Sequence, residues 1–254
     1  MNDYPPVSDS PQPAPAPQAV RVSVPQSAPY VTYSIIGITV FCYVLQLVSQ
    51  SVFGTDLLVL YGARVNEAIL RGELWRFITP ALLHGSLPHI AFNMYALLSF
   101  GTGLERHFGH GRFLLLYLLG AFTGNVASFL FTSGSYSVGA STAIFGLLGA
   151  EAVFLIQNRK MFAGRFRSAI GNIIFIAAVN LFIIGSLPNI DNWGHIGGLL
   201  GGLMFTSFAG PLWELEGIQP AYHLVDRRSP REVIIGAATV LLIFGGLAMW
   251  GMVR

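Results

Sequence analysis

Four polar side chains stand in apolar segments of this chain and could together carry out nucleophilic chemistry. Ser141 lies in VGASTAIFGLLG and His195 lies in NWGHIGGLLGG. His89 and Asn93 are four residues apart, so they share one face of a predicted helix. A serine hydroxyl becomes an effective nucleophile when a general base takes its proton, and histidine titrates near neutral pH. His89, Asn93 and the backbone N–H of Ser141 are candidate donors to the oxyanion that such an attack produces.

The composition places these side chains in a membrane protein. Hydrophobic residues make up 53% of the 254 residues and charged residues only 10%, whereas soluble domains carry about 25% charged residues. The net charge of +2 comes without a basic block that interleaves with aromatics, so we expect no nucleic-acid partner. The single cysteine, Cys42, excludes an intramolecular disulfide and a cysteine metal cluster. We therefore predict an all-α polytopic membrane protein in contact with the lipid bilayer.

Apolar runs indicate the helices that must position the four side chains, because a membrane-spanning helix needs about 20 apolar residues. Seven candidate runs lie near residues 32–51, 89–104, 112–132, 141–157, 169–186, 194–210 and 232–252. Several are short or interrupted by glycine, which favours a compact bundle with close helix contacts. The loop at 52–88 is too polar to span but rich in Trp, Phe and Leu, so we predict a partly embedded interfacial segment.

Lysine and arginine predict the orientation. They cluster after the second, fourth and sixth runs, whereas the loops TSGSYSV and SLPNIDN have none. The positive-inside rule then places the N-terminus in the cytosol and the C-terminus outside. The first loop opposes this with three arginines, although it also carries three acidic residues. In this orientation the second, fourth and sixth runs all begin in the outer part of the membrane. Ser141, His195, His89 and Asn93 are therefore expected at one depth, in a hydrated cavity that opens to the outer face.

Each polar residue also has a structural interpretation. Serine is ordinary at membrane helix interfaces, and histidine or asparagine there can bond a neighbouring helix. A metal site could use His84, His89 and His195, but these histidines have no HExxH spacing, and we expect no carboxylate or thiolate of the membrane spans to complete such a site. A transporter would need charged coupling residues near mid-membrane, and we expect none in these runs. Asp191 is predicted to cap the next helix or to face solvent, which leaves a Ser–His pair without an acid.

Three segments resemble, in order and spacing, the signatures of rhomboid intramembrane serine proteases. They are ELWRFITPALLHGSLPHIAFNM, GASTAIFG and GHIGGLLGG. The resemblance covers about residues 31–210 and implies a rhomboid-like six-helix bundle, to which a C-terminal seventh transmembrane helix is added. The predicted domains are, from the N-terminus, a disordered Pro-rich cytosolic tail (1–29), the six-span catalytic core (30–210) with its first loop (52–88), a cytosolic linker (211–231) and the extra helix (232–254).

The resemblance also implies roles. Ser141 would be the nucleophile, His195 its general base, and His89 with Asn93 part of the oxyanion hole, with no cofactor and no metal. Trp75 and Arg76 match a structural or regulatory pair of the first loop, Phe145 an aromatic against the catalytic histidine, and His84 a structural histidine. The implied reaction is hydrolysis of peptide bonds in or near the transmembrane segment of single-span proteins of the cell membrane. The implied substrates are those whose transmembrane helices unwind readily at Gly or Pro.

One departure from the family pattern affects the activity. The motif is usually Gly-x-Ser-Gly, and Thr142 stands where the last glycine is expected. We expect threonine to be tolerated if its side chain points away from His195. If the side chain points toward His195, we expect a longer distance between Ser141 and His195 and a lower activity. The alternative function is that of a catalytically inactive relative, which binds transmembrane clients without cleaving them.

Overall fold

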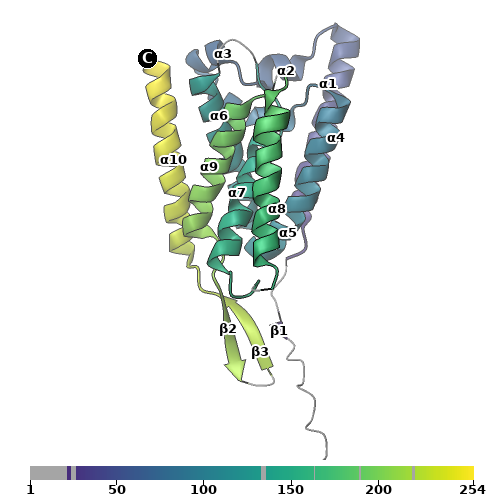
Figure 1. Cartoon of the computed structure of the whole chain (residues 1–254). Coiled ribbons are helices and arrows are strands. Elements are labelled where there is room, and N and C mark those ends of the chain that lie inside the picture. Colours follow the sequence, from purple (N-terminus) through teal and green to yellow (C-terminus); the bar gives the residue numbers. More distant parts are fainter. Residues whose placement is uncertain (1–21, 24–26, 133–135, 163, 189, 219–220) are drawn as a thin grey trace, which may run out of the picture.

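The structure is a computed structural model that describes residues 22–23, 27–132, 136–162, 164–188, 190–218 and 221–254. Most of the predicted Pro-rich tail (1–29) lies outside the described residues. Figure 1 shows long helices side by side in one bundle, with a small sheet beyond one end. The first-loop helices lie at the other end of the bundle (Figure 1). The prediction of an all-α polytopic membrane fold is confirmed, with the small sheet as an addition.

Each of the seven apolar runs corresponds to a helical segment. The segments are α1 (Tyr30–Phe53), the continuous stretch α4 (Leu87–Ala96), η3 (Leu97–Gly101) and α5 (Thr102–Phe108), α6 (His110–Phe131), α7 (Ser141–Gln157), α8 (Phe166–Ala178) continued by η4 (Val179–Ile183) and η5 (Ile184–Ser186), α9 (Asn192–Ala209) and α10 (Pro230–Val253). Within the described ranges, four are long and apolar enough to cross a membrane: α1, α6, α8 with its continuation, and α10. The site residues lie on the other three segments, α4–α5, α7 and α9, whose polar residues and glycines weaken the hydrophobic signal.

Helices α6, α7 and α9 form the centre of the bundle and pack through glycine. A Cβ atom on Gly146 of α7 would lie 2.9 Å from the Cα of Gly120 on α6. On α9, a Cβ atom on Gly198 or Gly202 would collide with a main-chain carbonyl oxygen of α7. The absence of Cβ atoms therefore lets the three backbones approach one another, as in other membrane helix pairs with small residues. Phe113, Leu147 and other apolar side chains fill the remaining core.

A buried carboxylate fixes the start of α1. Pro29 precedes this helix and provides no side-chain cap. Glu105 of α5, which is fully buried, instead accepts hydrogen bonds from the N–H groups of Val31 (2.8 Å) and Thr32 (2.7 Å). It also accepts from the Thr32 hydroxyl (2.7 Å) and lies 2.6 Å from His110 Nδ1. A carboxylate is favourable at a helix N-terminus because it satisfies free N–H groups and faces the positive end of the dipole.

The first loop contains four short helices that cover the end of the bundle where α4, α7 and α9 begin. They are α2 (Leu57–Gly62), α3 (Asn66–Leu70), η1 (Leu74–Phe77) and η2 (Thr79–Leu82). Arg76 is almost fully buried and donates to the carbonyls of Ala63 (2.6 Å) and Leu60 (2.9 Å) and to Glu73 (2.8 Å). Trp75 is exposed and donates to the carbonyl of Tyr61 at 2.9 Å. The pair that the family resemblance assigned to this loop therefore has structural contacts.

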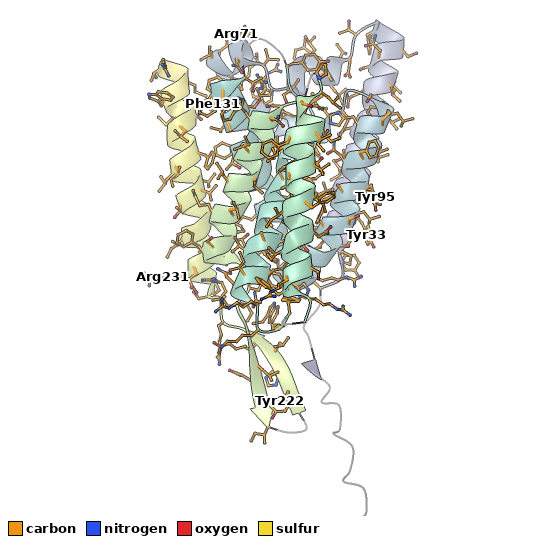
Figure 2. The ribbon with its side chains drawn as sticks, in the orientation of Figure 1. Tyr33, Arg71, Tyr95, Phe131, Tyr222 and Arg231 are labelled. Atoms are coloured by element: carbon orange, nitrogen blue, oxygen red, sulfur yellow. The ribbon has the colours of Figure 1, made fainter. Side chains whose placement is uncertain are left out.

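At the opposite end, the segment predicted as a linker (211–231) contains a hairpin. Strands β2 (Trp213–Ile218) and β3 (Ala221–Asp226) pair antiparallel, and β1 (Val22–Ser23) pairs parallel with β3. In Figure 2, Tyr222 marks the far part of this hairpin and Arg231 the start of α10, while Arg71 and Phe131 mark the opposite end of the bundle. The sequence pattern does not predict these strands, because they are short and lie between two stronger helical signals.

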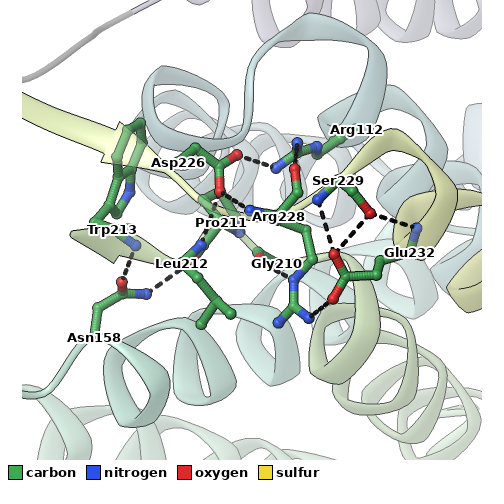
Figure 3. A network of polar contacts seen from close by, with 10 residues as sticks. All are labelled: Arg112, Asn158, Gly210, Pro211, Leu212, Trp213, Asp226, Arg228, Ser229 and Glu232. Carbon is green, nitrogen blue, oxygen red and sulfur yellow. Dashed lines mark hydrogen bonds and ion pairs between the residues drawn. The ribbon is translucent and has the colours of Figure 1, made fainter.

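Polar contacts attach the hairpin to the helices (Figure 3). Arg112 at the start of α6 donates to Asp226 of β3 at 2.6 Å. Asn158 at the end of α7 donates to the carbonyl of Pro211 (2.9 Å) and accepts from the N–H of Trp213 (2.8 Å). Arg228 donates to the carbonyl of Gly210 (2.9 Å). Thus the ends of α7 and α9 and the start of α6 are joined at the end far from the first loop.

Candidate active site

Ser141 and His195 are in hydrogen-bond contact across two adjacent helices. Ser141 is the first residue of α7, and His195 lies in the first turn of α9. The distance between Ser141 Oγ and His195 Nε2 is 3.0 Å. His195 is 6% exposed, so its ring is largely shielded from solvent. This distance suits direct proton transfer between a hydroxyl and a general base. The structure therefore brings these two predicted residues together, while their catalytic roles stay predictions.

An aromatic side chain holds the plane of the His195 ring. Phe145 lies four residues after Ser141, on the same face of α7. Its ring is stacked on the imidazole of His195, with 4.3 Å between centroids and 7° between planes. This contact is the one that the family resemblance implied for Phe145. Since the ring covers one face of the imidazole, it limits rotation of His195 away from Ser141.

His89 and Asn93 gather beside Gly139, two residues before Ser141. Gly139 has a φ of +128°, a conformation that L side chains rarely adopt. A Cβ atom there would lie only 2.7 Å from His89 Nε2 and 3.7 Å from Asn93 Nδ2. Glycine is therefore needed at position 139 both for its backbone conformation and for space. The candidate oxyanion donors lie next to the segment that leads into Ser141, and their part in catalysis stays a prediction.

His84 is a buried neighbour of this group. Its main-chain N–H and C=O both bond the side chain of Gln46 on α1, each at 3.1 Å. Its ring lies 5.0 Å from the ring of His89, and its Nε2 faces the N–H of Ala140 at 3.4 Å. These contacts connect α1, the end of the first loop and the residue before Ser141. They support the structural role that the resemblance implied for His84.

Asp191 caps α9, as the sequence predicted. Its carboxylate accepts from the N–H of Gly194 at 2.9 Å. It also accepts from the hydroxyls of Ser128 and Thr132 at the end of α6. Among the described residues, Nδ1 of His195 has no hydrogen-bond partner. The carboxylate nearest in sequence to His195 is thus engaged elsewhere, and the arrangement is a Ser–His pair rather than a triad.

Thr142 does not lengthen the Ser–His distance, because glycines on two other helices make room for it. Thr142 is 4% exposed. A Cβ atom on Gly124 of α6 would lie 2.5 Å from the Cβ of Thr142, and one on Gly194 of α9 would lie 3.0 Å from its Cγ2. The branched side chain therefore occupies space between α6 and α9. The 3.0 Å contact between Ser141 and His195 is maintained beside it.

Two acidic residues in or beside the apolar runs were not predicted from the sequence pattern. Glu105 caps α1, as described above. Glu151 lies on α7, ten residues after Ser141, which corresponds to about 15 Å along a helix. It is therefore outside the site, although a carboxylate inside an apolar run is a signal that could have been noted. Within the described part of the chain, no group of three or more His, Cys, Asp or Glu residues is arranged to hold a metal ion.

The fold and the site define a multi-pass membrane protein in which a serine and a histidine from neighbouring helices share a hydrogen bond. Residues 71–211 match the family described as the Rhomboid domain. That match covers more than half of the sequence, so the chain belongs to the rhomboid family, and the predicted family is confirmed.

Three relatives illustrate the similarity. Rhomboid protease GluP of Bacillus subtilis (strain 168) is 45% identical over 182 residues, which cover 72% of this chain and 35% of that protein. RHOMBOID-like protein 9, chloroplastic, of Arabidopsis thaliana is 37% identical over 158 residues, with 62% and 36% covered. RHOMBOID-like protein 6, mitochondrial, of the same plant is 44% identical over 195 residues, with 74% and 63% covered. The chain thus spans about a third of the length of the first two of these relatives.

Proposed function

We propose that this protein is an intramembrane serine endopeptidase that cleaves single-span membrane proteins in or near their transmembrane segment. The observation that supports this most is the 3.0 Å contact between Ser141 Oγ and His195 Nε2, which joins two of the central helices near the end that the first loop covers. Membership in a family that includes a bacterial rhomboid protease supports hydrolysis as the reaction.

In the proposed reaction His195 accepts and returns a proton in each of two stages, acylation of Ser141 and hydrolysis of the acyl-enzyme. Nε2 accepts the hydroxyl proton as Ser141 Oγ bonds to the carbonyl carbon of the scissile peptide. The backbone N–H of Ser141, with His89 and Asn93, stabilises the resulting oxyanion. The imidazolium then returns the proton to the leaving amide nitrogen, and the C–N bond breaks. Water, activated by the same histidine, hydrolyses the acyl-enzyme and releases Ser141.

The proposed orientation places the hairpin end in the cytosol and the site toward the outer face. The basic residues that follow α5, α7 and α9 lie at the hairpin end. The first loop holds three opposing arginines, but Arg64 and Arg76 are 1% and 3% exposed and have structural partners. Only Arg71 of the three presents its charge to solvent. Of the first-loop arginines, Arg71 is therefore the one that counts against the proposed orientation under the positive-inside rule.

The test is cleavage of single-span reporters that contain glycine in their helix. We expect cleavage by the wild type and a loss of about 10⁴-fold or more in Ser141→Ala and in His195→Ala. Ser99→Ala is the matched control, because the Ser99 hydroxyl is exposed and bonds only its own helix at Tyr95. Equal survival of several reporters with the wild type and with Ser141→Ala would contradict the proposal. Reporters that bind without being cut would favour the client-binding alternative.

A further inference from the structure

Arg64 is a buried cation that the proposed reaction does not use. It lies between α2 and α3 and is 1% exposed. Removing a guanidinium from water costs several kcal/mol unless partners compensate. Its Nη1 donates to Asn66 at 2.7 Å, and its Nη2 lies 3.9 Å from Oδ2 of Asp191. Burial lowers the pKa of the Arg64 guanidinium, and the carboxylates of Asp191 and Glu67 raise it. The Arg64 guanidinium is thus a buried charge that faces an amide oxygen of Asn66 and the carboxylate of Asp191.

The main chain of Arg64 holds the segment that leads into Ser141. Its N–H donates to the carbonyl of Ser137, and the N–H of Ser137 donates to the carbonyl of Arg64, each at 3.0 Å. Ser137 is four residues before Ser141. The preceding residue, Ala63, is held in turn by the buried Arg76. A displacement of the Arg64 main chain would therefore also displace Ser137 and the segment that leads into α7.

The side chain of Arg64 faces the start of the helix that carries His195. Asp191 is four residues before His195 and caps α9 through Gly194. The same carboxylate accepts from Ser128 and Thr132 at the end of α6. Asn66, which receives the Arg64 hydrogen bond, donates to the carbonyls of Phe129 and Thr132. One guanidinium is thus adjacent to the ends of both α6 and α9.

We propose that Arg64 and Asp191 form a positioning pair that sets the distance between Ser141 Oγ and His195 Nε2. Arg64 connects to Ser141 through the main chain of Ser137 and to His195 through the cap of α9. Neither residue contacts the reacting atoms. This inference rests on the proposed function, because it assigns these residues to the reactivity of the same Ser–His pair.

The test measures the reactivity of Ser141 without a protein substrate. A fluorophosphonate probe forms a P–O bond with an activated serine Oγ and releases fluoride, so its second-order rate constant reports how well the histidine activates Ser141. The full chain in lipid vesicles is compared with Asp191→Asn, Arg64→Met and Arg64→Lys, and reporter kinetics and melting temperature are measured alongside. The matched control is Arg71→Met, since Arg71 is an exposed arginine of the same loop.

We expect Asp191→Asn to lower the labelling rate and kcat by about 10- to 100-fold, because misplacement by about 1 Å is costly for reacting groups. We expect KM to stay within about twofold, Arg64→Lys to recover part of the labelling rate, and Arg71→Met to behave as wild type. The double variant Arg64→Met/Asp191→Asn should lose less than the product of the single losses. If Arg64→Met does not fold, Asp191→Asn and Arg64→Lys carry the test.

Two outcomes overturn the positioning pair while leaving the proposed function intact. One is wild-type labelling by folded Asp191→Asn and Arg64→Lys, and the other is a change in melting temperature or KM with kcat and labelling unchanged. A wild type that is neither labelled nor able to cut any reporter overturns the proposed function, and this pair with it.

Discussion

Two regions of the bundle differ in how they are held. Most residues of α6 are buried between α7, α9 and α10, whereas only 6% of the residues in the apolar part of the α8 span are buried. The central helices meet through glycine, with backbone against backbone. Helix α8 contacts α7 through a small apolar cluster that includes Ile173, Leu148 and Leu155. The Ser–His pair belongs to the first region. The short distance between Ser141 Oγ and His195 Nε2 is therefore found where the helices are closely packed.

Among variants that change helix packing alone, the largest expected effect comes from adding one methyl group to the central region. Gly198→Ala directs a Cβ atom into the main-chain carbonyl oxygen of Thr142, so α9 must move away from α7. We expect the free energy of unfolding to fall by about 1–3 kcal/mol and the labelling of Ser141 to fall by about 100-fold. Gly171→Ala on α8 is the matched control, because nothing lies within 4 Å of the added atom. Similar losses in both variants would contradict the comparison.

A smaller effect is expected at the contact between Thr142 and α6. Gly124→Ala places a methyl group against Thr142, and we expect a loss of about tenfold in reporter cleavage. Adding Thr142→Gly should restore part of this loss, because the colliding side chain is gone. The carbonyl of Gly194 remains close, so full recovery is not expected. Thr142→Gly alone should leave activity unchanged or raise it. A clear loss in that single variant would give the threonine side chain a positive role in catalysis.

The smallest effect is expected in α8. Ile173→Ala removes a buried side chain from the contact of α8 with α7. Because only two other buried side chains among the described residues, Leu148 and Leu155, belong to this cluster, α8 should become more mobile while α7 and α9 stay together. We expect Ser141 labelling within about twofold of wild type, measured with the melting temperature. A large loss of labelling would show that α8 also determines the Ser–His geometry.

Much of the fold was predictable from local sequence. The seven apolar runs indicated the seven long helical segments, because hydrophobic length is a local property. The hairpin was missed, since β2 and β3 are six residues each and lie outside the apolar runs. The role of Glu105 was also missed, because it caps a helix that begins more than seventy residues earlier in the chain.

The sequence by itself determined the seven apolar helical segments and which of them carry the serine, the two histidines and the asparagine of the candidate site. That these side chains lie at one depth in a membrane stays a prediction. It also offered a helix cap as one of two roles for Asp191, because the cap and α9 are adjacent in the chain. Only the tertiary structure decided that Gly124 and Gly194 make room for Thr142, and that Arg64 faces Asp191. These contacts join residues distant in sequence, and which backbones approach closely depends on how all the helices pack.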